Sequence, residues 1–190
     1  MSETPRPLFI PVILGTVRQG RRSEHAAQLV LEQTGKRAGV ETELIDIRSI
    51  PLPLDDAGEQ IKDRGFSALI QKSDGLILVV PEYNHGYPGL LKHVLDSNLE
   101  EYIHKAVGIC GVSAGPFGGS RVIEQLLPVL RELGLVTTFT DVNFSTIGKV
   151  FDDQGKLLDE KYTSRVDKFL DELIWMTRVL RHGRENIAPV

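Results

Sequence analysis

The chain lacks several features that would assign it early to a class of protein. A single cysteine, Cys110, excludes an internal disulfide and leaves too few thiols for a zinc cluster or an iron–sulfur site. Because Cys110 lies in the apolar run 106–110, we predict a buried small side chain rather than a reactive thiol. No apolar stretch reaches the roughly 20 residues of a membrane span, and residues 1–7 do not resemble a signal peptide. We therefore expect a cytoplasmic protein.

Strong charge of one sign is also missing. The formal net charge is -4, and there is no basic block beyond the pair Arg21 and Arg22. Such a balance gives no general attraction to nucleic acid or to an anionic membrane surface. We expect neither as a partner.

Several well-known enzyme motifs are absent as well. The dinucleotide fingerprint G-x-G-x-x-G fails because residue 17 is valine. Gly15 and Gly20 have the spacing of a nucleotide P-loop, but Arg21 and Arg22 replace its lysine and its hydroxyl. No nucleophile with an adjacent base and no phosphatase cysteine loop is visible, which disfavours a flavin-free hydrolase or phosphatase.

Short apolar runs alternate with amphipathic stretches along the whole chain. Pro11 lies in the first run and indicates a strand start or an irregularity there, and Gly39 is expected to end the first helix. Residues 51–58 are expected to form a proline-rich loop. The pattern predicts strands at 8–14, 42–47, 75–80, 106–112 and 135–140. It predicts helices starting near Ser23 and over 66–70, 90–95, 122–133 and 166–180.

This alternation predicts one doubly wound α/β domain over residues 1–190, with a core at about 8–180. The five strands would pair in parallel, with helices on both faces of the sheet. In such folds, ligands bind beyond the carboxyl ends of the strands. Three loops at that edge are unusual in composition: 15–23, 81–89 and 113–120.

The first of these loops suits a phosphate group. It joins a strand to a helix, so its backbone N–H groups and the positive end of the helix dipole would face the ligand. Thr16 and Ser23 offer hydroxyls, and Arg18 offers a guanidinium fork. The alternative is a simple helix cap at Ser23 with solvent-exposed arginines.

The other two loops suit a planar ring. Residues 81–89 contain two tyrosines, two prolines and Asn84, and the prolines restrict the loop before binding. The glycines of 113–120 would let a flat group approach the backbone closely. The tyrosines could instead pack on the sheet edge, His85 could be a surface histidine, and 113–120 could be only a turn. Together, the three loops match a mononucleotide with a large planar ring.

These residues resemble the family of NAD(P)H-dependent FMN reductases of flavodoxin-like fold, which includes azo, quinone and chromate reductases. The resemblance covers roughly residues 8–180 and is most specific in the Pro-Glu-Tyr-Asn sequence that begins at Pro81. Further matches are Gly15-Thr16-Val17-Arg18 with Ser23, and the glycines after Ser113. It implies a three-layer sandwich with strand order 2-1-3-4-5. It also implies a homodimer or homotetramer, and many members have serine at position 16.

The resemblance also implies roles for individual residues. The FMN phosphate would be held by Thr16, Arg18 and Ser23, with Arg21 or Arg22 assisting. The isoalloxazine and ribityl chain would lie against Pro81, Glu82, Tyr83 and Asn84, and the pyrimidine end against Ser113, Gly115, Gly118 and Gly119. His85 and Tyr87 would face the substrate, and no side chain is assigned a catalytic role.

The expected reaction is a transfer of reducing equivalents from NADPH or NADH, through FMN, to a small acceptor. Free flavin, a quinone, an azo compound or a metal oxyanion would all be possible acceptors, and the kinetics would be ping-pong. An alternative is a flavodoxin-like electron carrier without turnover of its own. Such carriers are commonly strongly acidic, whereas the charge here is only -4.

Overall fold

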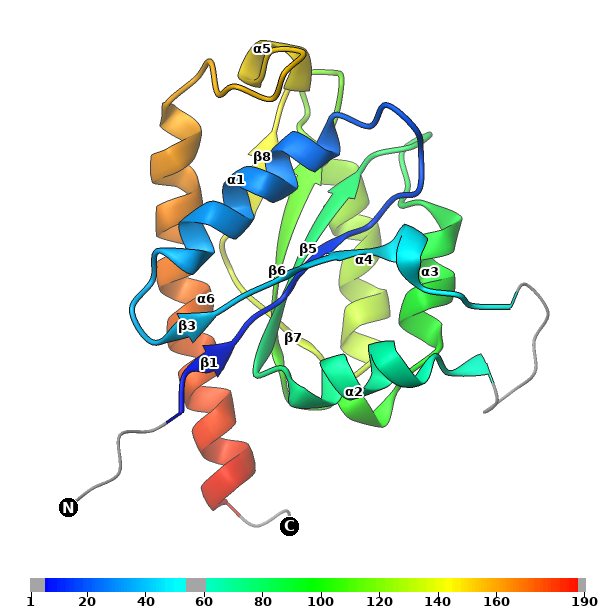
Figure 1. Ribbon diagram of the computed structural model, residues 1–190, viewed down its shortest axis with the longest axis vertical. Helices are drawn as coiled ribbons and strands as arrows, with labels where there is room; N and C mark the ends of the chain where they lie inside the picture. Colours follow the sequence, from blue (N-terminus) through cyan, green and yellow to red (C-terminus); the bar gives the residue numbers. More distant parts are fainter. Residues whose placement is uncertain (1–5, 54–60, 188–190) are drawn as a thin grey trace.

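The apolar runs form a parallel β-sheet with helices on both faces (Figure 1), in a computed structural model that describes residues 6–53 and 61–187. The strands are β1 Leu8–Phe9, β2 Val12–Leu14, β3 Val40–Glu41, β4 Leu44–Asp46, β5 Gly75–Pro81, β6 Ala106–Val112, β7 Val136–Thr137 and β8 Val142–Phe144. The α-helices are α1 Ser23–Gly35, α2 Arg64–Lys72, α3 Gly89–Asp96, α4 Ser120–Glu132, α5 Ile147–Val150 and α6 Lys161–Asn186. Two short 3₁₀ helices, η1 Ile47–Ser49 and η3 Glu100–Tyr102, complete the described elements.

The order of the strands confirms the flavodoxin-like arrangement. The main sheet runs β4-β2-β5-β6-β7, β8 also pairs with β6, and β1 pairs with β3. All these pairings are parallel. Since β1 and β2 are two parts of the first predicted strand, and β4 lies within the second, the order is 2-1-3-4-5. Parallel pairing places the carboxyl ends of β2, β5 and β6 at one edge of the sheet.

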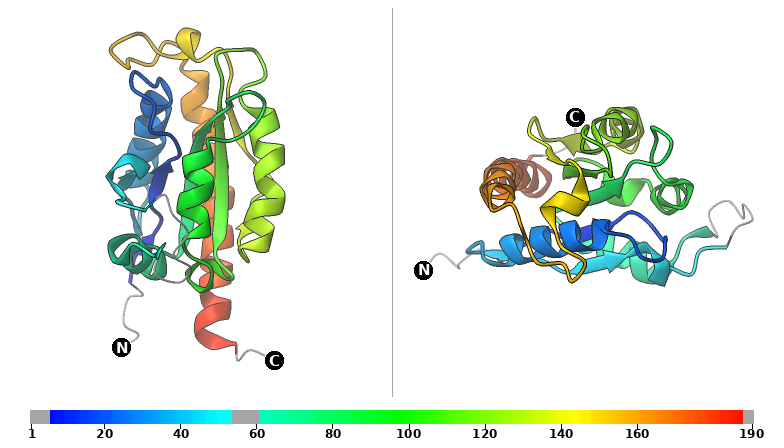
Figure 2. Two further views of the ribbon diagram at one scale, coloured as in Figure 1. Left: turned by 90° about the vertical axis from the view of Figure 1, so that its right-hand side faces the viewer. Right: turned by 90° about the horizontal axis from the view of Figure 1, so that it is seen from above.

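Two hydrophobic clusters pack on opposite faces of the sheet. Side chains of α1 and α6 form one cluster with β2, β6 and β8, and side chains of α2, α3 and α4 form the other. The view from above in Figure 2 shows α1 and α6 on one side of the strands and α3 and α4 on the other. Every residue of β5 and β6 is buried, which explains their continuous apolar sequence. Cys110 lies within β6 and is fully buried, as predicted.

A glycine in β6 sets the distance between the sheet and α6. A Cβ atom at Gly108 would collide with the ring of Phe169, so the helix lies closer to the strand than any other residue would permit. Phe169 is fully buried at this contact.

Two predicted strands are interrupted. The first breaks at Ile10 and Pro11, where proline has no N–H to donate, as its position indicated. The predicted strand over 135–140 is wrong in its extent, because β7 ends at Thr137 and the chain rejoins β6 as β8. The amides of Phe139 and Thr140 donate to the Glu172 carboxylate, at 2.5 and 3.0 Å, instead of to a strand.

Other boundaries differ by a few residues. Helix α1 ends at Gly35 rather than at Gly39, which has a φ of 74° in the turn before β3. Helix α5 was not predicted. The predicted loop 51–58 lies partly outside the described residues. Within 6–53 and 61–187, no helix is both long enough and apolar enough to cross a membrane.

Candidate functional site

The loops after β2, β5 and β6 enclose a cleft of about 410 Å³ at the carboxyl edge of the sheet. This edge is the upper end of the molecule in Figure 1, beside α5. The cleft is lined by Arg18, Gln19, Gly20, Arg21, Arg22, Ser23, Pro81, Glu82, Tyr83, Val112, Ser113, Ala114 and Ile147. A cavity therefore lies where the three loops were predicted to form the site.

A buried arginine fixes the first loop. The guanidinium of Arg21 donates to both carboxylate oxygens of Asp46, at the end of β4, and to the backbone carbonyl of Thr16. Burial acts against the charge of Asp46, but hydrogen bonds from Arg21 and Arg48 outweigh it and hold the pKa of Asp46 well below its usual value. Arg21 thus lines the cleft with its terminal nitrogens already bound inside the protein, whereas its buried Nε has no hydrogen-bond partner among the described residues.

The start of α1 leaves a polar group without a partner. Ser23 is the first residue of the helix and is buried, and its Oγ has no hydrogen-bond partner among the described residues. A buried hydroxyl without a partner costs roughly 1–3 kcal/mol, so a ligand oxygen at this point would remove a penalty. The helix dipole favours an anion at the same place.

The first and second loops contact each other through Tyr83. Its hydroxyl lies 2.8 Å from Oγ1 of Thr16, and the guanidinium of Arg18 lies 5.6 Å from the centre of its ring. The Arg18 side chain is exposed and lines the cleft. Arg22 is half-buried and pairs with Asp153, beyond α5. Thr16 is buried behind the cleft and does not line it.

The Pro-Glu-Tyr-Asn loop contains a tight turn. Tyr83 and Gly86 exchange two backbone hydrogen bonds of 2.9 Å, and between them Asn84 and His85 have positive φ values of 49° and 69°. Two such residues define a type I′ turn, for which asparagine is well suited. The side chains of Asn84 and His85 are exposed, whereas Tyr87 is half-buried against the cluster that contains α3 and α4.

The third loop is tightly packed at one end and open at the other. A Cβ at Gly119, where φ is 82°, would lie 2.6 Å from the backbone nitrogen of Val112. Gly118 also has a positive φ, of 61°. Gly115 faces open space, and Ser113 donates to its carbonyl at 2.9 Å. Of the predicted residues here, only Ser113 lines the cleft.

A carboxylate forms part of the cleft wall. The side chain of Glu82 is only 6% exposed, and its Oε1 accepts hydrogen bonds from Arg121 in the first turn of α4. Its Oε2 is buried and has no partner among the described residues. The cleft therefore offers an anion site at Ser23 and a free acceptor at Glu82.

This arrangement fits FMN, which carries a phosphate, hydroxyl and N–H donors, and a planar ring. Eight predicted residues line the cleft: Arg18, Arg21, Arg22, Ser23, Pro81, Glu82, Tyr83 and Ser113. The other seven do not: Thr16, Asn84, His85, Tyr87, Gly115, Gly118 and Gly119. Five further residues line the cleft and were not predicted, four of them next to predicted residues in the chain: Gln19, Gly20, Val112, Ala114 and Ile147. Ile147 belongs to the unpredicted helix α5, and no sequence signal pointed to it.

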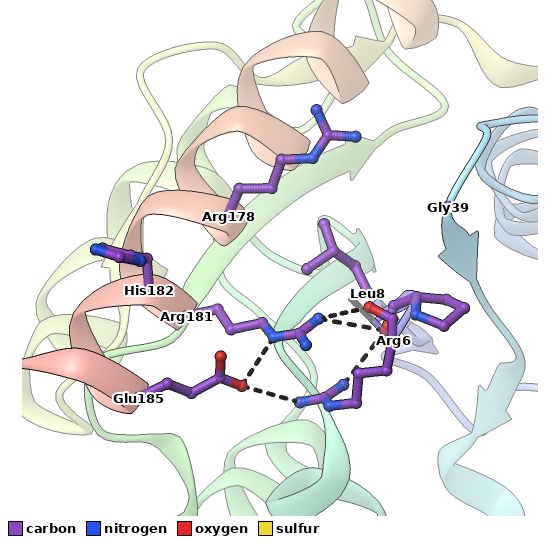
Figure 3. A pocket seen from close by; sticks show the side chains of 8 residues that line it. Arg6, Leu8, Gly39, Arg178, Arg181, His182 and Glu185 are labelled. Atoms are coloured by element: carbon purple, nitrogen blue, oxygen red, sulfur yellow. Dashed lines mark hydrogen bonds and ion pairs between the residues drawn. The ribbon is translucent and has the colours of Figure 1, made fainter. Parts of the chain in front are cut away.

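A second hollow, of about 690 Å³, lies at the opposite edge of the sheet, between α6 and the start of β1 (Figure 3). Its lining is Arg6, Pro7, Leu8, Gly39, Arg178, Arg181, His182 and Glu185. Beside it, Arg6 binds both oxygens of the buried Asp74 at 2.8 Å, and Arg181 binds Glu185 at 2.9 Å. These cations are neutralised within the protein, unlike the unpaired groups of the first cleft.

Comparison with known proteins gives a consistent result. The family model for NADPH-dependent FMN reductases matches residues 9–148. An NAD(P)H-dependent FMN reductase of Pseudomonas aeruginosa is 31% identical over 88% of this chain and 94% of its own length. An FMN-dependent NADPH-azoreductase of Staphylococcus aureus is 26% identical over 86% of this chain and 92% of its own.

The solved structures agree in fold. A flavoenzyme NAD(P)H:(acceptor) oxidoreductase of Paracoccus denitrificans superposes with a TM-score of 0.72, at 22% identity. The match covers 89% of this chain and 98% of that one.

Proposed function

This chain belongs to the family of NADPH-dependent FMN reductases, and we propose that its carboxyl-edge cleft holds FMN for the reduction of a small acceptor by NADPH or NADH. The observation that carries the proposal is the buried, unpaired hydroxyl of Ser23 at the start of α1, inside the cleft formed by the three loops. Bound FMN supplies the redox chemistry, because it accepts a hydride and passes on two electrons.

The residues of the first loop bind and orient the cofactor through its phosphate group. Ser23, Arg18 and the helix dipole hold the phosphate, and Arg21 fixes the loop by binding Asp46 and the Thr16 carbonyl. Arg22 contributes positive charge at the cleft wall beside its pair with Asp153. Thr16 supports the site through its contact with Tyr83.

The other two loops hold the ring. Pro81, Glu82 and Tyr83 form one wall, and the rigid turn keeps Asn84 beside them. Ser113 lies at the other wall and donates to the carbonyl of Gly115, which lies outside the lining, while Gly118 and Gly119 allow this loop to pack closely on β6 and β8. Hydrogen-bond donors of this wall would stabilise negative charge at the pyrimidine end of a bound flavin.

The exposed turn with His85, and Tyr87 next to it, face the donor and the acceptor, which bind in succession at one place. This order gives ping-pong kinetics. The acceptor is a small molecule, such as a quinone, an azo compound, a metal oxyanion or free flavin. We also propose a homodimer or homotetramer that works in the cytoplasm, where its nicotinamide donor is found.

A spectrum and a turnover assay test this function. The purified protein, incubated with FMN and passed through a desalting column, should keep a flavin absorbance band. It should then oxidise NADPH or NADH steadily with benzoquinone and no other protein present, with parallel lines in double-reciprocal plots. Flavin uptake without such turnover would instead indicate an electron carrier, and no uptake of FMN would overturn the proposal.

A further inference from the structure

Glu82 is the only acidic residue among the described residues that line the cleft, where three arginines are also present. Its position is fixed by the backbone, because its amide donates to the carbonyl of Val112 at 2.8 Å and so extends the pairing of β5 with β6. The carboxylate therefore lies beside the carboxyl ends of the two central strands. It cannot turn out to solvent without breaking its contact with Arg121.

The pair between Glu82 and Arg121 is one-sided. Both Nε and one terminal nitrogen of Arg121 lie 2.7 Å from the same oxygen, Oε1. A bidentate pair would use both carboxylate oxygens, as Arg6 does with Asp74. Here Oε2 is left buried without a donor among the described residues. An acceptor buried in this way points to a donor on the molecule that occupies the cleft.

Arg121 also joins the two loops assigned to the ring. Its guanidinium carbon lies 4.8 Å from the ring centre of the exposed Phe117, in the third loop, and its charge is held on Glu82, in the second. Arg121 itself does not line the cleft. Arg121 therefore influences the cofactor by its charge and by holding Glu82, and not by direct contact.

We propose, building on the FMN site proposed above, that Oε2 of Glu82 accepts a hydrogen bond from an N–H or hydroxyl donor of FMN and that Arg121 is a positioning residue that balances the charge of Glu82. The pair then controls the flavin midpoint potential. A negative charge near the flavin disfavours the electron-rich reduced form, and a positive charge favours it.

The two partners therefore have opposite effects when they are removed singly. E82Q leaves the charge of Arg121 unbalanced and raises the midpoint potential. R121M leaves the carboxylate unbalanced, lowers the potential and weakens binding of the anionic cofactor about tenfold, because an uncompensated negative charge then lies beside it. The double variant E82Q/R121M returns towards the wild-type potential. A purely structural role would shift both single variants in the same direction.

The test measures the FMN dissociation constant and the midpoint potential of wild type, E82Q, R121M and E82Q/R121M, by titration and by equilibration with a reference dye. R131M, which removes an exposed arginine at the far end of α4, is the matched control and should change neither quantity. Shifts of E82Q and R121M in the same direction, or no shift in E82Q, would overturn the inference.

If R121M fails to fold, E82Q alone decides the question, because it must still raise the potential. The proposed function is judged separately by the wild type. A wild-type protein that binds FMN while E82Q leaves the potential unchanged refutes only the role of Glu82. A wild-type protein that binds no FMN refutes the function itself.

Discussion

Buried polar groups at the two ends of the sheet differ in how many partners the protein gives them. At the amino end, Asp74 is 2% exposed and receives Arg6 on both oxygens, the amide of Phe9 at 2.9 Å, and the nearby charges of Arg181 and Arg184. At the carboxyl end, Ser23 and Glu82 each keep a buried oxygen without a partner. The protein itself supplies the partners of Asp74, whereas Ser23 and Glu82 offer hydrogen bonds that the described protein does not make.

This difference distinguishes the two cavities of the molecule by their unpaired polar groups. The hollow in Figure 3 is the larger of the two, but Arg6 and Arg181 beside it already bind acids of the protein itself. Removing one partner of such a pair would leave a charge without compensation. The smaller cleft carries groups whose cost in the free protein is recovered only when a ligand binds. Unpaired polar atoms that line a cavity therefore distinguish the cleft from the hollow better than cavity size does.

The largest loss of stability is expected from a substitution at the amino end of the sheet. D74N leaves Arg6, Arg181 and Arg184 without their shared anion, so the free energy of unfolding should fall by about 3 kcal/mol. FMN affinity of the folded protein should stay unchanged, because Asp74 lies at the opposite edge of the sheet. Urea unfolding and FMN titration check the two parts. E185Q is the control, since Glu185 is half-exposed, and an equal loss there would contradict the special role of Asp74.

The next largest effect is expected at the carboxyl end, where a substitution should weaken FMN binding without lowering the stability of the protein. S23A removes a hydroxyl that bonds to nothing within the described protein, so the melting temperature without FMN should stay the same or rise. FMN should bind about tenfold more weakly, as expected for the loss of one hydrogen bond to a charged group. Fluorescence titration measures the affinity, with S164A on the surface of α6 as control. Unchanged FMN affinity would remove Ser23 from the site.

The smallest change in stability is expected at a half-buried acid whose pKa is raised. Asp141, between β7 and β8, is half-buried, and its burial, together with Glu172 and Glu124, raises its pKa to about 6. Because its pKa in the folded state exceeds its unfolded value of 3.8, its stabilising contribution is complete below that value and is lost as the pH rises through 6.

D141N should therefore be more stable than wild type at pH 7, by about 1 kcal/mol once solvent screening is allowed for, or some 2–4 °C in melting temperature. At pH 4 the two proteins should melt together. Thermal unfolding across this range provides the check, and the exposed Glu132, changed to glutamine, should show no such crossover. A constant difference at all pH values would mean that Asp141 does not titrate as described.

The sequence predicted those parts of the fold that depend on local pattern. The strands β5 and β6 were predicted within one residue, because buried parallel strands are continuously apolar. The fifth strand was wrong in extent because Glu172, more than 30 residues away, binds the amides of Phe139 and Thr140. No pattern within 135–140 could reveal that contact.

The same limit applies to the site. The sequence placed the three loops correctly at the carboxyl edge, and Ser23 lies in the cleft as predicted. It could not show that the guanidinium of Arg21 is bound by Asp46, on another strand, or that Glu82 pairs with Arg121 across two loops. Both pairs depend on the order in which the strands assemble.

The measurement that tests the account most directly compares FMN with riboflavin, which lacks only the phosphate. If the buried hydroxyl and the helix start at Ser23 hold that phosphate, FMN should bind to the flavin-free protein at least about a hundredfold more tightly in calorimetric titration. In S23A the preference for FMN should shrink. Equal affinity for the two flavins, or a preference that S23A leaves intact, would contradict the account.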